Sequence, residues 1–321
     1  MTEFQLVWSW QIALYLFLGG MGAGAFIMSA VLRFYDRGCT EKTVLVSSWI
    51  AIACLASGLL LLLFDLTNPL RGLLLWQSFS HFESWMTIGA WILFCGIIDM
   101  FLFAVASTPW AQEHFPSIAS NRFKDALAII GSVLGFSICA YTGILLMCAP
   151  GVPLWNTLLL PCLFTVSALD TGAALVELVS CAFDRQERTE AAAKPRSSLL
   201  IERITIILAV LELAVLAVYL GTMLAGLGAA SAIEATAAKS AALLVNGMLA
   251  PQFWILVVAL GLALPLFVAG RGIARGAIDA KAATMCGAIG VLVGGCSLRF
   301  LILLAGMHAD TVLDTFMTFF C

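Results

Sequence analysis

The sequence has 321 residues, of which 62% are hydrophobic and only 11% are charged. A typical soluble domain carries roughly 25% charged residues, so this chain has too few charges to coat a soluble surface. The composition excludes a soluble enzyme, a disordered protein and a nucleic-acid-binding protein, and it predicts an all-α integral membrane protein. The formal net charge of −3 is less informative than the positions of the charges.

Eight apolar windows are long enough to cross a bilayer as helices, because a hydrocarbon core of about 30 Å needs roughly 20 residues. In chain order they are Trp8–Leu32, Val44–Phe64, Trp85–Ala106, Asp125–Cys148, Thr157–Ala182, Ile204–Gly228, Ala250–Ala269 and Ala283–Gly306. The first window follows only seven residues without a basic leader, so it is predicted to be a retained span and not a signal peptide. The short loops leave no room for a soluble domain.

Thirteen of the sixteen Lys and Arg residues fall in the loops on one side of these windows. They are Arg33, Arg37, Lys42, Arg122, Lys124, Arg185, Arg188, Lys194, Arg196, Arg203, Arg271, Arg275 and Lys281. By the positive-inside rule this side is cytoplasmic, so both termini are predicted to lie on the periplasmic side of a bacterial inner membrane. The other side holds Arg71 and Lys239, and Arg299 lies inside the last window.

The polar stretch at residues 183–202 is predicted to be a cytoplasmic linker. It separates residues 1–182, predicted to form a four-helix bundle plus a fifth helix, from residues 203–321, whose three helices complete a second four-helix bundle. Glycines four residues apart indicate close helix packing, and their recurrence in the fourth and eighth windows is weak support for two related halves. These pairs are Gly20 and Gly24, Gly131 and Gly135, and Gly290 and Gly294.

The cysteines and histidines predict no metal centre in this chain. None of the ten cysteines belongs to a Cys-x-x-Cys pair of the kind typical of iron–sulfur and zinc sites, so they are interpreted as small buried hydrophobes. The sequence leaves open whether Cys148 and Cys162 form a disulfide. The three histidines, His81, His114 and His308, fall in loops or at helix ends, so no haem is predicted within the bundle.

Five ionisable residues lie inside the apolar windows, where a functional role is the default hypothesis. They are Asp99, Asp170, Glu177, Glu212 and Arg299. Asp170 and Glu177 are seven residues apart, so they share one face of a helix, and a chain of acids along that face could carry protons. The alternative is that Arg299 pairs with one of the acids and no transport occurs.

A second polar group is predicted at the outer ends of the first four windows. It comprises Gln11, Asp65, Asn68, Arg71, His81, Glu83 and Tyr141. Tyr141 falls roughly two turns below the outer surface, where its phenol could hydrogen-bond a quinone oxygen. Quinol oxidation releases protons, so Asp65, His81 or Glu83 would relay them to water. An interfacial tyrosine and a solvated loop histidine are the alternatives for Tyr141 and His81.

Seven stretches, in order along nearly the whole chain, carry a family resemblance. They are Trp10–Phe26, Asp65–Arg71, Ser84–Trp91, Gly135–Gly143, Pro153–Asn156, Leu163–Leu169 and Leu298–Phe300. Each stretch alone is weak, but the ordered set resembles the NrfD/PsrC-type membrane subunits of polysulfide-reductase-like complexes.

This resemblance implies an eight-helix anchor that binds a dissociable menaquinone or ubiquinone and holds neither haem nor an iron–sulfur cluster. In that family the subunit pairs with a ferredoxin-like four-cluster iron–sulfur subunit, and usually with a molybdopterin catalytic subunit, on the outer face. The tyrosine of the family's fourth helix matches Tyr141.

One departure from the family pattern concerns the first helix. Some members contact the quinone there with an Asn and a His, whereas this chain offers Gln5, Trp8, Trp10 and Gln11. The partner of the second quinone oxygen therefore stays open among His81, Asp65 and Gln11. Quinone binding is assigned to Gln11, Tyr141, Asn68 and Arg71, and catalysis to Tyr141, His81, Asp65 and Glu83.

The sequence predicts the quinone-reactive membrane subunit of a multi-subunit oxidoreductase, which exchanges electrons with an external iron–sulfur subunit and is not catalytic alone on the terminal substrate. The alternative is a proton-translocating or solute-transporting protein that uses the intramembrane acids. Transporters often contain helices broken near mid-membrane. Pro161 and Pro265 are the relevant breakers, and neither has an equivalent in the other half. The intramembrane acids argue against a third alternative, a purely structural anchor.

Overall fold

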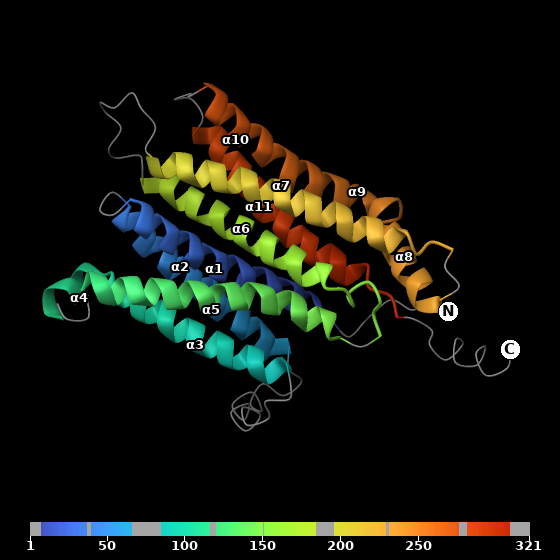
Figure 1. Cartoon of the computed structure of the whole chain (residues 1–321), viewed down its shortest axis with the longest axis horizontal. Coiled ribbons are helices and arrows are strands. Elements are labelled where there is room, and N and C mark those ends of the chain that lie inside the picture. The colour runs from blue at the N-terminus through green and yellow to red at the C-terminus, as the bar shows by residue number, and fades with distance from the viewer. Residues whose placement is uncertain are drawn as a thin grey trace.

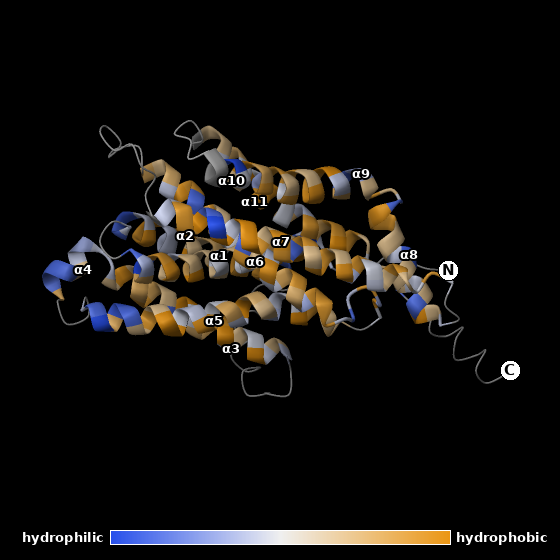
Figure 2. Ribbon diagram, turned by 45° about the horizontal axis from the view of Figure 1, so that its top comes forward, coloured by the Kyte–Doolittle hydropathy of each residue, from blue (hydrophilic) through white to orange (hydrophobic). Residues whose placement is uncertain are grey.

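The computed structural model of the chain describes residues 8–36, 40–65, 85–115, 120–149, 151–183, 196–228, 231–275 and 281–308. Within these ranges the chain is mostly helical, and the long helices run side by side in one elongated body (Figure 1). Hydrophobic residues predominate along the helices, and hydrophilic residues gather toward their ends (Figure 2). This distribution is the one expected of helices that cross a hydrocarbon layer.

Within the described residues, eight helical segments are long and apolar enough to cross a membrane, which confirms the predicted number of spans. They are α1 (Trp10–Tyr35), α2 (Glu41–Asp65), α3 (Trp85–Ala106), α5 (Asn121–Met147), α6 (Leu159–Phe183), α7 (Arg196–Leu224), the run of α9 (Ala250–Gln252), η2 (Phe253–Ala263) and α10 (Leu264–Arg275), and α11 (Lys281–Leu304). Large apolar side chains such as Phe64, Met86 and Phe136 are exposed on their outer faces, where lipid would cover them.

The largest boundary difference concerns α7, which begins at Arg196, whereas hydropathy predicts a start at Ile204. Two charged residues, Glu202 and Arg203, lower the apolar average of the first turns. Glu202 is nevertheless only 2% exposed, because its side chain points into the interior of the molecule. Part of the predicted linker is therefore helical, and residues 184–195 lie outside the described residues.

Two short helices are not apparent from hydropathy. In α4 (Pro109–His114), the Thr108 side chain accepts a hydrogen bond from Ala111 N, and proline at the first position suits a helix start. The second short helix, α8 (Ala232–Val245), buries an alanine-rich face and contacts α7. Both are too short to cross a membrane, so a span search does not find them.

The two prolines lie at different places in their spans: Pro161 near one end of its span, and Pro265 within the continuous run from Ala250 to Arg275, closer to its middle. Pro161 lies in the first turn of α6, where a missing N–H costs no intrahelical hydrogen bond. Pro265 lies in the first turn of α10 and directly follows η2, a π-helical stretch of 11 residues. The wider turns of η2 accommodate the change of backbone hydrogen bonding ahead of this proline.

Helices α1 and α6 lie at the centre of the molecule. Helix α1 contacts α2, α5, α6 and α11, while α6 also contacts α5, α7 and α11. The backbones of α1 and α6 approach most closely at Gly24 and Gly172, where an added Cβ would overlap the backbone of the other helix. This contact confirms the close helix packing predicted for the Gly20 and Gly24 pair.

Basic residues mark one end of the molecule, which we call the basic end. Arg33 lies in the last turn of α1, Lys42 and Lys124 lie in the first turns of α2 and α5, and Arg271 lies near the end of α10. Arg33 forms an ion pair with Asp125, with Nη2 and Oδ1 2.9 Å apart, so α1 and α5 are joined there. The other end, where α1 begins and α11 ends, is called the opposite end.

Candidate functional site

Tyr141 lies on α5 toward the opposite end, with its ring against the backbone of α3. The ring faces Gly89, and a Cβ at that position would overlap the Tyr141 ring. Tyr141 is only 7% exposed, and its hydroxyl has no hydrogen-bond partner among the described residues. A phenol hydroxyl that no described group satisfies is available to hydrogen-bond a ligand or water.

A second phenol, Tyr15 of α1, is missed by sequence reasoning. It interacts electrostatically with Tyr141, is 4% exposed and packs beside Gly58 of α2. Tyr15 lies four residues after Gln11, so the two side chains share one face of α1. This spacing is the signal by which the sequence could have revealed Tyr15.

Gln11 and Asp65 lie at the opposite end, where α1 begins and α2 finishes. The Oε1 atom of Gln11 is buried and has no hydrogen-bond partner in the described part of the chain. Asp65 Oδ1 accepts a hydrogen bond of 2.5 Å from Ser9 Oγ, which ties the ends of α1 and α2 together. The other predicted members of this group, Asn68, Arg71, His81 and Glu83, lie outside the described residues, so their roles stay predictions.

Asp99 lies apart from the other buried acids. It is on α3 and 7% exposed, and its Oδ2 has no hydrogen-bond partner among the residues described. An added Cβ at Gly131 of α5 would overlap both this oxygen and the ring of Phe26. Asp99 is therefore enclosed between α1, α3 and α5, and the structure does not bring it together with the acids of α6 and α7.

Arg299 of α11 is fully buried and reaches toward α6. Its Nη1 donates hydrogen bonds to Ser167 Oγ at 3.1 Å and to the Gly295 carbonyl at 2.8 Å. Its Nη2 donates to the Phe164 carbonyl at 3.5 Å. The guanidinium carbon also lies 5.3 Å from the ring centroid of Phe164 and 5.8 Å from that of Phe17. Carbonyls, a hydroxyl and aromatic faces therefore stabilise this charge.

Two further acids are buried on α6 and α7, and one of them interacts with the guanidinium. Glu212 of α7 interacts electrostatically with Arg299 and is within hydrogen-bonding reach of Ser167. Asp170 of α6 is 1% exposed, neither of its carboxyl oxygens has a hydrogen-bond partner among the described residues, and it interacts electrostatically with Glu212 and Glu177. Four of the five predicted intramembrane ionisable residues are thus grouped between α6, α7 and α11.

Within the described ranges, no three His, Cys, Asp or Glu side chains converge closely enough to hold a metal ion. Cys148 and Cys162 are both free thiols, so they do not form a disulfide. His114 stacks on Trp110 at the end of α4, and His308 follows α11. Both histidines therefore lie outside the eight spans.

The fold and these groups define a class of protein: a helical membrane protein of eight spans with a phenol site near one end and an ionisable group in its interior. The chain belongs to the family described as "Polysulphide reductase, NrfD", which it matches over residues 2–309. The resemblance predicted from the ordered motifs is thus confirmed.

Three relatives match half or more of this sequence. It is 32% identical to a polysulfide reductase chain of Wolinella succinogenes, over 94% of both proteins. It is 30% identical to protein NrfD of Escherichia coli, over 94% of this chain and 95% of that protein. It is also 25% identical to a selenate reductase subunit of Mesobacillus selenatarsenatis, over 53% of this chain and 46% of that protein. Membrane subunits of reductase complexes are therefore its relatives.

Proposed function

We propose that this chain is the quinone-reactive membrane subunit of an oxidoreductase complex and exchanges electrons between menaquinone or ubiquinone and an external iron–sulfur subunit. The observation that carries the proposal is the Tyr141 phenol, which packs against Gly89 and has no hydroxyl partner among the described residues. The names of two relatives, subunits of polysulfide and selenate reductases, support it.

The polar atoms at this site fit a quinone head group. Such a ring needs a donor for each oxygen when oxidised and an acceptor for each hydroxyl when reduced. Tyr141 can donate or accept a hydrogen bond, and the buried, unpartnered Oε1 of Gln11 can accept one. Bound quinol supplies the electrons and protons of the reaction.

Each side chain has a separate task in this proposal. Tyr141 orients the head group and takes up a proton from it, while Tyr15 and the surrounding apolar side chains exclude water. Asp65 accepts that proton at the end of α2, close to the surface. In the segment outside the described residues, His81 and Glu83 share the proton transfer and Asn68 and Arg71 share the binding.

The proposal includes an orientation and partners. The basic end faces the cytoplasm of a bacterial cell, since positively charged loops are retained there. The Tyr141 site then faces the periplasm, where a ferredoxin-like four-cluster iron–sulfur subunit and a molybdopterin catalytic subunit dock. In the inner membrane, α1, α2, α3 and α5 form one four-helix bundle, and α6, α7, the α9–α10 run and α11 form the second. The buried Asp170 and Glu212 favour proton movement as an accompanying function.

Replacing Tyr141 by Phe in the purified complex tests the quinone site. The substitution removes the hydroxyl and keeps the ring on Gly89, so the fold should persist. Quinol oxidation should fall about 100-fold or more, the scale expected for a lost acid–base group, and a quinol-site inhibitor should bind more weakly. Tyr35→Phe, at an exposed position at the basic end, is the matched control. Wild-type turnover and inhibitor affinity in Tyr141→Phe would contradict the proposal.

A further inference from the structure

A pocket of about 740 Å³ lies at the basic end, where α1 and α3 end and α2 and α5 begin, beside α4. The charged and amide-bearing side chains that line it are those of Arg33, Asp36, Glu41, Gln112, Asn121 and Lys124. Figure 2 shows hydrophilic residues over α4 and over the start of α5 at this end of the molecule. We call this cavity the Lys124 pocket.

Lys124 is the side chain in this pocket that most needs a ligand. It is only 6% exposed, and within the described residues its ammonium group donates no hydrogen bond and forms no ion pair. Burying an ammonium ion is costly unless a partner stabilises it. Because Lys124 lines the pocket, a hydrogen-bond acceptor in the pocket can reach its three N–H donors. The pocket therefore suits a ligand with a negatively charged group.

The second basic side chain of the pocket, Arg33, already has its partners. Its Nη2 lies 2.9 Å from Asp125 Oδ1, and the same nitrogen donates a hydrogen bond of 3.4 Å to Asn121 Oδ1. The Asn121 amide nitrogen, in contrast, donates to no other described residue. The available donors of the pocket are thus the ammonium of Lys124 and the amide of Asn121, and both can bind the oxygens of a phosphate.

Two carboxylates, from Asp36 and Glu41, also line the pocket. Glu41 interacts electrostatically with Lys124, but no ion pair joins the two side chains, and the Asp36 carboxylate accepts no hydrogen bond from a described residue. A ligand that is only negative would be repelled by these two carboxylates. A ligand that carries an N–H cation as well as an anion would satisfy the carboxylates and Lys124 together.

The position of the pocket along the spans favours a lipid head group over a free solute. Among the described spans, α1 finishes at Tyr35 and α3 at Ala106, while α2 starts at Glu41 and α5 at Asn121. Lipid head groups lie at the level where spans end. The side chains of Tyr35 and of Trp110 on α4 are exposed at this end, as is typical of aromatic residues at a membrane interface.

An exposed aromatic pair offers a surface for the acyl chains of such a lipid. Trp49 of α2 and Phe101 of α3 pack edge to face, with ring centroids 5.8 Å apart, and both are exposed. Trp49 is eight residues after Glu41, so it lies about 12 Å farther along α2, away from the basic end. A lipid with its head group in the pocket can therefore extend its chains toward this pair.

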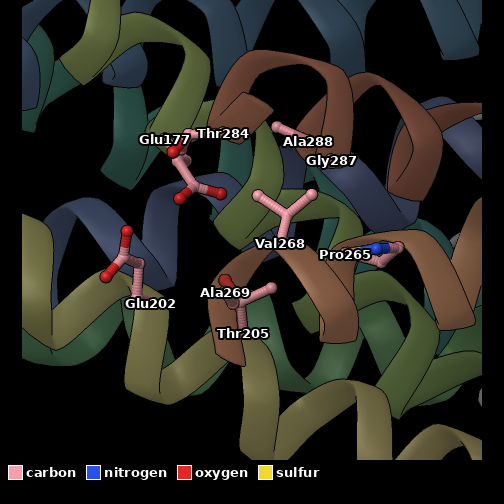
Figure 3. Close-up of a pocket in the computed structure, with 9 residues that line it drawn as sticks. All are labelled: Glu177, Glu202, Thr205, Pro265, Val268, Ala269, Thr284, Gly287 and Ala288. Atoms are coloured by element: carbon pink, nitrogen blue, oxygen red, sulfur yellow. The ribbon is translucent and has the colours of Figure 1, made fainter. Parts of the chain in front are cut away.

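The pocket between α6, α7, α10 and α11 does not have this chemistry (Figure 3). It has a volume of about 220 Å³, and its described lining residues include Glu177 and Glu202 but neither a lysine nor an arginine. It therefore offers no positive charge to a phosphate. The comparison restricts a head-group site to the Lys124 pocket.

We propose that the Lys124 pocket binds the head group of phosphatidylethanolamine, a phospholipid that carries both a phosphate and a primary ammonium. Lys124 and Asn121 donate hydrogen bonds to the phosphate oxygens, and the lipid ammonium donates to the carboxylates of Asp36 and Glu41. Phosphatidylcholine has no N–H donor for these carboxylates, and phosphatidylglycerol has no cation. The site goes beyond the quinone proposal because it uses no residue of the Tyr141 site.

Native mass spectrometry of the delipidated full-length chain in detergent, without quinone, tests the site. The chain is titrated with phosphatidylethanolamine, phosphatidylcholine and phosphatidylglycerol that have identical acyl chains. We expect the wild type to bind phosphatidylethanolamine most tightly, and Lys124→Met to weaken this binding about 10-fold or more, the scale of a lost hydrogen bond to a charged group. Methionine suits a buried position, so the fold should persist in thermal unfolding. Lys239→Met, at an exposed position on α8, is the matched control.

The carboxylates are tested through the choice of lipid. In the double variant Asp36→Asn and Glu41→Gln, which keeps side-chain size and removes both negative charges, phosphatidylglycerol should bind at least as tightly as phosphatidylethanolamine. Glu234→Gln, at an exposed position on α8, should keep the wild-type preference. This variant keeps Lys124, so it tests the site independently of the folding of Lys124→Met.

Three outcomes would overturn the lipid site. The first is a wild type that binds the other two lipids as tightly as phosphatidylethanolamine, and the second is wild-type affinity in a folded Lys124→Met chain. The third is an unchanged lipid preference in the double variant. If glycerophosphoethanolamine, the head group without acyl chains, displaced the lipid at equal concentration, a soluble ligand would replace the lipid. Because no quinone is present, failure of the Tyr141 proposal would not alter these readouts.

Discussion

The two halves of the molecule bury polar groups of different kinds. In the half that contains α1 to α5, the candidate site uses phenols and an amide, from Tyr141, Tyr15 and Gln11, which are uncharged and lie toward one end. In the half that contains α6 to α11, Glu212 interacts with the guanidinium of Arg299 deep in the interior, and Asp170 interacts with Glu212. Uncharged donors and acceptors suit an apolar carrier that enters from lipid, whereas ionisable groups suit the storage of protons. Two ionisable residues of the first half are exceptions: Asp99, and Lys124 at the basic end, are also buried.

Two buried tyrosines show the same contrast within one residue type. The Tyr219 hydroxyl on α7 donates a hydrogen bond of 2.8 Å to the Leu154 carbonyl. The Tyr141 hydroxyl has no such partner in the described part of the chain. A phenol that the backbone already satisfies fixes structure, whereas an unpartnered phenol is available to a ligand. The contrast between the halves can therefore be tested by matched substitutions.

The largest effect is expected from Arg299→Met. Removing the guanidinium leaves the carboxyl of Glu212 without its neighbouring positive charge, and breaking a buried ionic group costs roughly 3–5 kcal/mol. We expect little folded chain in detergent, measured by size-exclusion chromatography and thermal unfolding. Arg203→Met, at an exposed position on α7, is the matched control.

Adding Glu212→Gln to Arg299→Met sharpens this test. If charge imbalance causes the loss, the second substitution should restore part of the folded yield, because it removes the carboxyl that lost its positive neighbour. An Arg299→Met chain that unfolds at the wild-type temperature would show that the α6–α11 half does not depend on charge balance, and the contrast between the halves would fail.

Gly89→Ala should have the next largest effect. The added Cβ overlaps the Tyr141 ring, so the phenol must move although its chemistry is unchanged. A displacement of about 1 Å in a reacting group can cost on the order of 100-fold in rate, so quinol oxidation should fall about as far as in Tyr141→Phe. Gly221→Ala is the control, because a Cβ there meets nothing within 4 Å. Normal turnover in Gly89→Ala would separate Tyr141 from the contact with α3.

The spans could be predicted from sequence because a helix that crosses the lipid layer needs roughly 20 mostly apolar residues, and a hydropathy window of that length detects them. The predicted and observed ends of α3, Trp85–Ala106, are the same. The start of α7 could not be predicted in this way. Hydropathy scores Glu202 as a charged residue, whereas in the fold its side chain is buried against neighbouring helices. The role of Gly89 depends on its contact with Tyr141, a residue on another helix. The sequence pattern of a single window therefore cannot reveal that role.

The candidate site could be predicted in part for a similar reason. A charged residue in an apolar window is visible in the sequence, and this identified Asp170, Glu212 and Arg299. Tyr15 was missed because a tyrosine near a helix end is ordinarily an interfacial residue, and only its position beside Tyr141 distinguishes it. The separation of Asp99 from the other acids likewise depends on which helices are neighbours, and hydropathy does not encode this.

The smallest effect is expected from Tyr219→Phe, which makes in the α6–α11 half the change that Tyr141→Phe makes in the other half. The substitution leaves the Leu154 carbonyl without its donor, which costs about 1–2 kcal/mol of unfolding free energy. Thermal unfolding should therefore shift to lower temperature, while quinol turnover per folded complex stays at the wild-type value. Tyr141→Phe should give the reverse, since its hydroxyl stabilises nothing among the described residues. If Tyr219→Phe also lowered turnover per folded complex, the second half would take part in the quinol reaction, and the division of tasks between the halves would be wrong.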